Sequence, residues 1–335
     1  MIILLAIPVA VFLAYKLLKW FPMTSTLFRI VYTLYTKTPL GYLFHLHQLN
    51  QYKSSHDQPH SNVTAWTCNG IKIIPIAICY DNYSYLIISL GNKQAVLVDP
   101  SDPDTIKEVV ARENVKLEAI LTTHKHWDHS GGNRALQAHF PGIAIYGSPI
   151  DNIPSLTHPV EDNDVIRTGS IKFTAIFTPG HTLGHTVYLL DGAPFDVPDS
   201  LFSGDLLFLS GCGQIFEGQP SEMLHSLQMI SVLKDNTLLW PGHEYAAKNL
   251  MFALTIEPNN PFIRSKLDSV LALRTNKCNT CPSTIGEEKS YNPFLRTHIT
   301  DVISAVGLDV LPPEQNENLH ASVLKALRER KNNFK

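Results

Sequence analysis

The segment Thr123–Gly132, THKHWDHSGG, constrains the fold and chemistry of this chain more than any other stretch. It places three histidines and one aspartate within six residues. Histidine forms helices and strands weakly and costs desolvation free energy when buried. A cluster this dense therefore needs a chemical reason. His124 and His126 are two positions apart, and in an extended segment such residues project to the same side. The segment therefore predicts half of a metal site.

Three further metal-type residues follow apolar runs, and each comes directly after a short turn sequence. Pro-Gly precedes His181, Ser-Gly precedes Asp205 and Pro-Gly precedes His243. Glycine lets the backbone turn sharply, so that the next side chain projects from the rim of a sheet. Since Asp128 and His129 can turn toward a second ion, the whole set predicts a site for two metal ions. Imidazole and carboxylate ligands suit zinc, and they also suit iron or manganese.

Residues 71–244 consist of short β-rich runs separated by stretches of helical periodicity. IKIIPIAIC, QAVLVDP and EAILTTH are typical of strands. Residues 105–113, 133–140 and 221–233 repeat their apolar positions as helices do. Mixed strands and helices of this kind predict a layered α/β sandwich as the catalytic domain. From 245 to 335 the strand pattern stops, so we expect a second, all-helical region there.

The first residues differ from those of a plain soluble enzyme. Residues 1–15 are uncharged and apolar, and the apolar run continues past Lys16 to Phe21. A membrane-spanning helix needs roughly 20 such residues. We therefore expect a transmembrane anchor at residues 1–21, followed by a juxtamembrane segment and linker at residues 22–70. A cleaved signal peptide is the alternative, although the basic segment that usually precedes one is missing.

Charge and cysteine content predict where the catalytic part lies. The basic residues near the apolar run, Lys16, Lys19, Arg29 and Lys37, all lie on its C-terminal side. The positive-inside rule then predicts a single-pass membrane protein with a cytosolic catalytic domain, and association with mitochondria stays open. Five cysteines, a sparse and odd number, fit a reducing compartment. The 27 Lys and Arg against 30 Asp and Glu provide no basic surface for nucleic acid.

The metal-type residues resemble those of the metallo-β-lactamase superfamily. Residues 124–129 match its H-x-H-x-D-H signature in full, and the three further ligand positions follow in the family's order. The resemblance implies an αββα sandwich that holds two divalent ions, most simply zinc. The ligands that it implies are His124, His126 and His181 for one ion, Asp128, His129 and His243 for the other, and Asp205 as the bridge.

Within this superfamily, residues 70–335 resemble glyoxalase II, the hydroxyacylglutathione hydrolases. The segments TPGHTLGH, GCGQIFEG, PGHEYA and CPSTIGEEKSYNPFLR carry the resemblance. It implies hydrolysis of a glutathione thioester, such as S-D-lactoylglutathione, by a hydroxide between the ions that Asp128 and Asp205 orient. The apolar N-terminus, YTLYTKTPLGYLF and LLFLSGCG also resemble a membrane-anchored member of the family.

The resemblance reaches the residues that hold glutathione, with two departures. Family members carry a lysine and a tyrosine where this chain has Gln214 and Phe216, and they share Tyr245. Arg328 and Lys331 fall where the family has two basic residues that meet the glycine carboxylate of glutathione. Charge pattern alone would instead place both on a solvated helix face. Losing a charged donor removes roughly 1.5 to 3 kcal/mol of hydrogen-bonding free energy, so we expect a weak or altered thioester specificity.

Two other functions fit the same residues. A membrane-bound scaffold would use its metal site mainly to stabilise the fold, and the exchanges at Gln214 and Phe216 favour it. A mononuclear iron persulfide dioxygenase would share the H-x-H-x-D-H signature. The helical C-terminal region and His243 argue against the dioxygenase.

Overall fold

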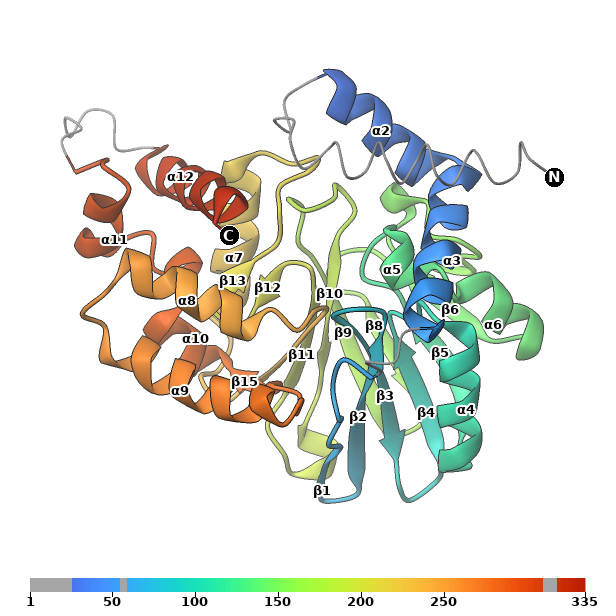
Figure 1. The fold of residues 1–335 in the computed structure, drawn as a ribbon. Helices are drawn as coiled ribbons and strands as arrows, with labels where there is room; N and C mark the ends of the chain where they lie inside the picture. The colour runs from blue at the N-terminus through green and yellow to red at the C-terminus, as the bar shows by residue number, and fades with distance from the viewer. Residues whose placement is uncertain (1–25, 55–58, 310–317, 335) are drawn as a thin grey trace.

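The strands form two sheets that face each other. The computed structural model describes residues 26–54, 59–309 and 318–334, in which helices flank the two sheets (Figure 1). Strand β3 (Asn82–Ser89) explains this layering, because every one of its residues is buried. Tyr85 and Ile87 belong to the core between the sheets. The alternate residues Leu86 and Ile88 belong to the core beneath the helices. The predicted α/β sandwich is confirmed.

The first sheet contains seven strands: β1 (Trp66–Cys68), β2 (Ile71–Ile78), β3, β4 (Gln94–Val98), β5 (Lys116–Leu121), β6 (Ala144–Gly147) and β7 (His158–Pro159). They lie across the sheet in chain order. The pairs from β1 to β4 are antiparallel, and the pairs from β4 to β7 are parallel. Parallel neighbours need a crossover, which helices α4 (Pro103–Glu113), α5 (Trp127–Ser130) and α6 (Asn133–His139) supply. The turn η1 (Pro149–Asp151) precedes β7.

The second sheet contains six strands: β8 (Val165–Thr168), β9 (Ile171–Phe177), β10 (Thr186–Leu190), β11 (Ser200–Gly204), β14 (Leu238–Pro241) and β15 (Ser283–Thr284). Their order across the sheet is β15-β14-β11-β10-β9-β8. Strands β11 and β14 pair in parallel and are connected through helix α7 (Pro220–Ser231). A small hairpin of β12 (Leu207–Phe208) and β13 (Gly211–Cys212) lies in the same connection, and η2 (Ala193–Phe195) precedes β11.

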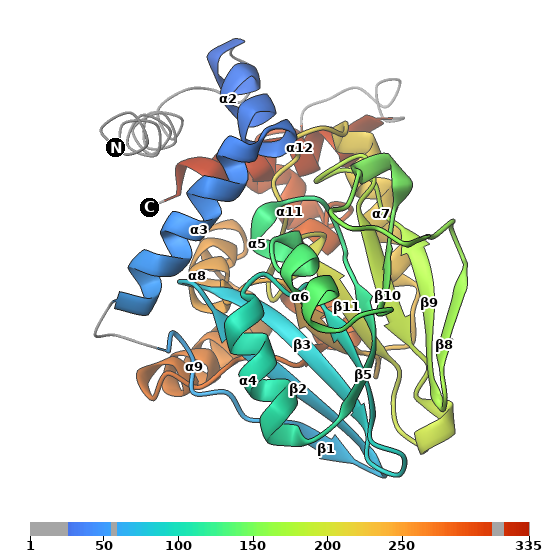
Figure 2. The same cartoon turned by 90° about the vertical axis from the view of Figure 1, so that its right-hand side faces the viewer.

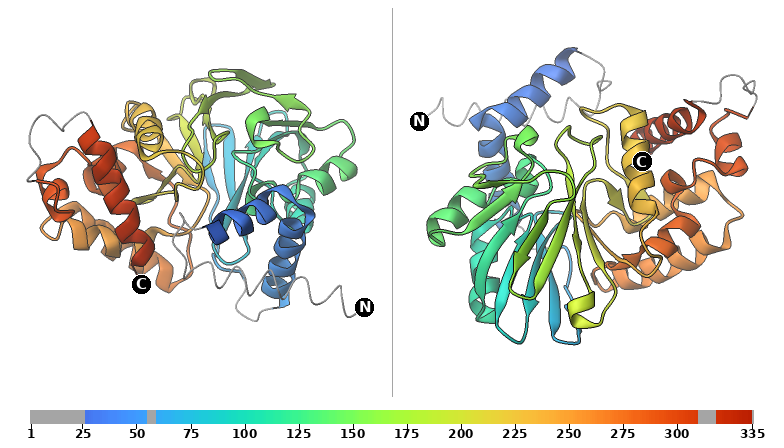
Figure 3. Two further views of the ribbon diagram at one scale, coloured as in Figure 1. Left: turned by 90° about the horizontal axis from the view of Figure 1, so that it is seen from above. Right: turned by 180° about the vertical axis from the view of Figure 1, so that it is seen from behind.

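The C-terminal helices pack on the outer face of the second sheet. They are α8 (Ala246–Ile256), α9 (Pro261–Thr275), α10 (Ile285–Tyr291), α11 (Thr300–Ala305) and α12 (Leu319–Asn333), with the turn η3 (Pro293–Leu295). Leu250, Phe294 and Leu327 share one apolar core with Val187 and Leu201 of the sheet. Figure 3 shows these helices, coloured orange to red, gathered on one side of the sandwich. The predicted helical region is confirmed, although β15 within it pairs with β14.

Two helices, α2 (Thr26–Lys37) and α3 (Pro39–Ser54), precede the sandwich. Helix α3 buries Phe44, Leu49 and Tyr52, and Nε2 of its His45 donates to the carbonyl oxygen of Ser101 over 2.9 Å. Figure 2 shows α3 running beside α5, with α2 continuing above it. The segment predicted as a juxtamembrane stretch and linker therefore includes helices that pack on the catalytic fold.

The predicted membrane location requires a correction. Across residues 26–54, 59–309 and 318–334, the structure has no helix whose length and apolar character would let it cross a membrane. Helices α2 and α3 have 12 and 16 residues, against the roughly 20 that a span requires. The anchor predicted at residues 1–21 lies outside the described residues. The predicted single-pass membrane location is thus contradicted as far as the described helices go, since none of them could serve as its span.

Candidate metal centre

All seven predicted ligands lie together at one edge of the sandwich, just beyond the C-terminal ends of strands. Residues 124–129 follow β5 and enter α5, His181 follows β9, Asp205 follows β11 and His243 follows β14. Within each of three groups, the ligand atoms lie no more than 4.8 Å apart. The groups are His124, His126 and His181; His124, His129 and Asp205; and Asp128, His129 and His243.

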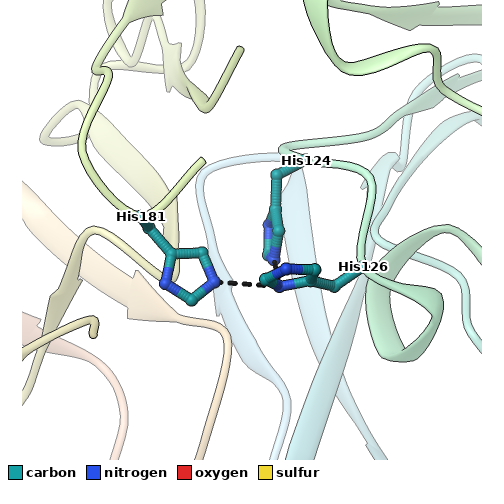
Figure 4. A group of neighbouring side chains, drawn as sticks. All are labelled: His124, His126 and His181. Atoms are coloured by element: carbon teal, nitrogen blue, oxygen red, sulfur yellow. Dashed lines mark hydrogen bonds between the residues drawn. The ribbon is translucent and has the colours of Figure 1, made fainter. Parts of the chain in front are cut away.

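In the first group, three ring nitrogens converge on one point. Nε2 of His124 and Nε2 of His181 each lie 3.0 Å from Nδ1 of His126 (Figure 4). Nδ1 of His181 lies 2.8 Å from the carbonyl oxygen of Gln214. A carbonyl can only accept, so Nδ1 of His181 holds the proton. Nε2 of the neutral ring then offers its lone pair to the point of convergence.

The other two rings of this group are fixed in the same way. Nδ1 of His124 lies 3.0 Å from Oγ1 of Thr123, and Thr123 gives its own proton to Asp99. Nε2 of His126 lies 3.1 Å from the hydroxyl of Tyr32, and this hydroxyl donates its proton to Glu217. Both hydroxyl oxygens therefore accept from the imidazoles. Three lone pairs meet, which is the arrangement that a divalent cation such as zinc requires.

The second group combines two histidines with a carboxylate. Nε2 of His129 and Nε2 of His243 lie 3.3 Å apart, with Oδ2 of Asp128 3.8 Å from the first and 3.7 Å from the second. Nδ1 of His129 donates to Asp99, and Nδ1 of His243 donates to Asp81, each over 2.9 Å. Carboxylates behind ligating imidazoles set the tautomer and the ring orientation. The donor set therefore fits a second cation.

Asp205 lies between the two groups. Its Oδ1 is 3.3 Å from Nε2 of His129 and 3.3 Å from Nε2 of His243, and its Oδ2 is 3.4 Å from Nε2 of His181. Oδ1 is buried, and it accepts no hydrogen bond from the residues that the structure describes. A buried anionic oxygen without a partner is costly. A cation on each side would satisfy it, so the geometry fits a bridging carboxylate.

The charge states differ between the two groups. Burial lowers the pKa of His124, His126 and His181, so these rings are neutral and able to ligate at pH 7. Burial also opposes a proton on His243, but the nearby carboxylates, led by Asp205, raise its pKa to about 10. The same effect raises the pKa of His129. A divalent cation at this carboxylate-rich group would displace those protons, so binding there is coupled to proton release.

Two glycines allow the ligand loops to approach so closely. Gly204 has a φ of +47°, and a Cβ at this position would lie 2.6 Å from Oγ1 of Thr123. A Cβ on Gly242 would lie 2.7 Å from Oδ1 of Asp205. Any side chain at either position would push apart the groups that hold the centre.

Three of the residues predicted to hold glutathione border the metal-ligand histidines. The ring of Phe216 lies 5.1 Å from that of His181, and the ring of Tyr245 stacks on His243 at 4.8 Å. Gln214 contributes its backbone carbonyl to His181, while its side-chain amide donates to Asn332 over 3.4 Å. The side chain at Gln214 is therefore lightly held.

The two predicted basic residues lie on α12, where they face inward. Arg328 is buried and donates to the carbonyl of Cys212 over 2.8 Å and to Asn332 over 2.5 Å. Its Nε has no hydrogen-bond partner among the described residues. Lys331 donates to the carbonyl of Lys248 over 3.1 Å, and burial lowers its pKa to about 7. Arg328 thus does not lie on a solvated face, as charge pattern alone suggests.

Sequence reasoning missed the residues that hold the ligands in place. Asp99 accepts from His129 and also from the backbone and hydroxyl of Thr123, and Asp81 holds His243. Asp99 lies at the end of the strand-like run QAVLVDP and Asp81 precedes the run NYSYLI, and no Pro-Gly or Ser-Gly turn marks either of them as it marks the ligands. Tyr32 and Glu217 lie in YTLYTKTPLGYLF and GCGQIFEG, which carry the family resemblance, but nothing in either segment predicts that the two side chains meet behind His126. Their role depends on how α2 packs, which no local pattern encodes.

Comparison with protein families supports the division seen in the structure. The model of the Metallo-beta-lactamase superfamily matches residues 78–243. The model described as Hydroxyacylglutathione hydrolase C-terminus matches residues 244–334. The two matches together cover the sandwich from β3 onward and the C-terminal helices.

Curated relatives share the same name. The chain is 43% identical over 229 residues to a hydroxyacylglutathione hydrolase of Thermosynechococcus vestitus, covering 68% of this chain and 89% of that protein. It is 40% identical to the hydroxyacylglutathione hydrolase-like protein of Gallus gallus, over 79% of this chain and 91% of that one. It is 39% identical to an Arabidopsis thaliana hydroxyacylglutathione hydrolase, over 71% of this chain and 92% of the relative. The Arabidopsis protein is named cytoplasmic, which accords with the correction of the membrane location.

A solved structure extends the likeness to the fold. A metallo-beta-lactamase from Staphylococcus aureus subsp. aureus COL matches with a TM-score of 0.53 and 25% identity, over 78% of this chain and 73% of that chain. The chain therefore belongs to the hydroxyacylglutathione hydrolase, or glyoxalase II, family of the metallo-β-lactamase superfamily, whose members are metal-dependent thioesterases that use two divalent ions.

Proposed function

We propose that this chain hydrolyses glutathione thioesters, taking S-D-lactoylglutathione or a similar compound to glutathione and a hydroxy acid. One observation carries the proposal: Asp205 joins two ligand groups in a chain that continues into the hydroxyacylglutathione hydrolase C-terminal region. The names of the curated relatives support the same activity.

We assign the ligands by the tautomers that their partners impose. The assignment is His124, His126 and His181 to one ion, Asp128, His129 and His243 to the other, and Asp205 to both. Five imidazoles and two carboxylates suit zinc, and iron or manganese accepts the same donors. Two bound divalent ions supply a hydroxide nucleophile at neutral pH and polarise the thioester carbonyl.

Asp205 and Asp128 orient the attacking water. Burial disfavours the charge on Asp205, but His243 and His129 hold its pKa well below the ordinary range, so it stays ionised and accepts a hydrogen bond. The side chain of Asp128 is 29% exposed against 11% for Asp205, so Asp128 is the more open of the two to solvent. Attack forms a C–O bond and breaks the C–S bond, and the glutathione thiolate leaves.

The glutathione portion binds beside the second sheet and α12. Tyr245 and Phe216 give it aromatic walls next to the ligands His243 and His181. Arg328 and Lys331 supply positive charge for its glycine carboxylate, and a carboxylate on Arg328 would give the unpaired Nε a partner. Because Gln214 is uncharged, this face attracts glutathione through fewer cations than the family pattern provides.

The test measures metal content and turnover on the same purified full-length chain. We expect about two ions per chain and hydrolysis of S-D-lactoylglutathione that a chelator abolishes and added zinc restores. Replacing His181 by alanine should remove one ion and the activity. His225, an exposed histidine on α7, is the matched control, and His225→Ala should keep both.

Other outcomes would replace the proposal. Two bound ions with no thioester turnover would identify a scaffold with a structural metal site. A single iron with consumption of oxygen and a glutathione persulfide would identify the dioxygenase.

A further inference from the structure

Helix α2 lies against the loop that carries the first ligands. It precedes both regions that the family models match, the first of which begins at residue 78. Nε1 of Trp127, between the ligands His126 and Asp128, donates to the carbonyl of Tyr35 over 2.8 Å. The next helix, α3, closes on the same contact, since a Cβ on its Gly41 would lie 2.6 Å from Nε1 of Trp127 and would clash with the carbonyl oxygen of Tyr35. The helix is therefore fixed to the ligand loop.

Tyr32 of α2 contacts a ligand histidine directly. Its hydroxyl lies 3.1 Å from Nε2 of His126 and donates to Oε1 of Glu217 over 3.0 Å. Its ring meets the His126 ring edge-on and stacks on Phe216 at 5.3 Å. Phe28, one turn earlier on the helix, stacks on both Tyr32 and Phe216. The phenol is thus held by aromatic contacts on its faces and by hydrogen bonds at its oxygen.

Glu217 determines which way the Tyr32 proton points. Its Oε1 and Oε2 lie 2.6 and 2.8 Å from Nζ of Lys125, and Oε2 also accepts from the backbone N–H of Leu183 over 3.0 Å. Burial opposes its charge, but these donors lower its pKa, so it remains an ionised acceptor. Tyr32 must then donate to Glu217, which leaves the phenol oxygen as an acceptor for Nε2–H of His126.

His126 differs from the other four ligand histidines in the nitrogen that it presents. Those four hold their protons on Nδ1 and turn Nε2 toward the centre, while His126 turns Nδ1. A neutral histidine that ligates through Nδ1 needs an acceptor at Nε2. At this ring the acceptor comes from α2.

We propose that Tyr32 is a positioning residue for the metal ligand His126. It fixes the Nε2–H tautomer and the ring orientation, so that a helix outside the catalytic sandwich completes the first ligand group. The inference rests on the proposed ligand role of His126 and is independent of which thioester is hydrolysed.

The test compares Tyr32→Phe with Tyr42→Phe in the full-length chain. Tyr32→Phe keeps the stacked ring and removes the acceptor. Tyr42 lies on the neighbouring helix, and its ring packs at a tilt against that of Trp127 with the centroids 5.2 Å apart, without a hydrogen bond to a ligand side chain in the described residues. Titration of metal-free protein with zinc against a competing chelator should show one ion bound about 10- to 100-fold more weakly in Tyr32→Phe. The other ion, and both ions of Tyr42→Phe, should keep the wild-type affinity.

Two further readouts separate positioning from packing. Cobalt substitution should give an altered absorption spectrum in Tyr32→Phe and the wild-type spectrum in Tyr42→Phe. In the zinc-loaded wild-type protein, ¹⁵N NMR of the histidine rings should show His126 alone among the five ligands with its proton on Nε2. This second measurement needs no variant, so it holds even where Tyr32→Phe fails to fold.

The inference is overturned when Tyr32→Phe binds both ions with wild-type affinity and spectrum, or when His126 carries its proton on Nδ1. Its failure differs from failure of the proposed function. A wild-type chain that binds two ions but turns over no thioester leaves the role of Tyr32 intact. A wild-type chain that binds no ions removes the basis of both.

Discussion

The metal centre and the proposed glutathione face, made of Gln214, Phe216, Tyr245, Arg328 and Lys331, are neighbours whose side chains are held in different ways. Each ligand histidine has its second nitrogen engaged by another group, as Asp99 engages His129 and Asp81 engages His243. Among the described residues, the side chain of Gln214 makes one hydrogen bond, at 3.4 Å. Because both nitrogens of each ligand imidazole are engaged, we expect a substitution among the ligands or their partners to disturb the metal centre. The recognition face can change one residue at a time while the chemistry next to it remains.

The largest effect should come from Asp205→Ala. Because this carboxylate serves both ligand groups, its removal should release both ions and reduce thioester turnover to background. Metal analysis and a steady-state assay on the same sample measure this. Asp235, an exposed residue paired with Lys289, provides the control, since Asp235→Ala should leave both values unchanged. Full activity in Asp205→Ala would show that the two groups do not depend on one bridge.

Asp99→Asn tests the groups behind the ligands. The carboxylate accepts three hydrogen bonds on its two oxygens, from the backbone N–H and hydroxyl of Thr123 and from Nδ1 of His129. An amide has only one acceptor oxygen, so at least one of these donors would lose its partner, and metal affinity should fall by about 10- to 100-fold. Chelator competition measures the change. Asp104, exposed on α4, should tolerate the same substitution without effect. Wild-type affinity in Asp99→Asn would mean that the ligand rings hold their orientation without this support.

On the recognition face, Lys331 should give a pH-dependent effect. Burial lowers its pKa to about 7, so the ammonium is present below pH 7 and lost above it. If it meets a glutathione carboxylate, kcat/KM should decline as pH rises through 7. Lys331→Arg, which stays charged, should abolish this decline, and Lys331→Ala should raise KM roughly tenfold or more. Identical pH profiles for wild type and Lys331→Arg would exclude this contact.

Gln214→Lys should have the smallest effect. A cation at this lightly held position should lower KM by up to about tenfold and leave kcat nearly unchanged, because it binds a part of the substrate that does not react. Steady-state kinetics with S-D-lactoylglutathione gives both constants. A change confined to kcat would mean that Gln214 acts on the reacting group instead.

The ligands were predictable because their signal is local. Four of the ligands fall within the six residues 124–129, and a turn sequence precedes each remaining ligand. The partners of the rings were not predictable in the same way. Thr123, Asp99 and the carbonyl of Gln214 acquire their roles only when separate strands bring them together.

The same distinction between local and long-range signals applies to the fold. Short β-rich runs such as IKIIPIAIC, which contains β2, indicated the strands, and the apolar periodicity of α4 and α7 indicated their helices. The packing of α3 was missed, because it buries Gly41 and His45 along with its apolar residues and so lacks a clear stripe. Strand β15 has two residues, too few for any alternation to register.

The pairing of β15 with β14 bears on how the polypeptide can be divided. Leu238 and Leu239 pair with Thr284 and Ser283, and further hydrogen bonds join residues 285 and 286 to the turn before β14. A protein cut at residue 244 would present β14 as an open sheet edge beside an uncovered apolar face. Such a fragment would be prone to self-association. The two matched regions are therefore inseparable in practice, and we expect them to melt in one cooperative transition.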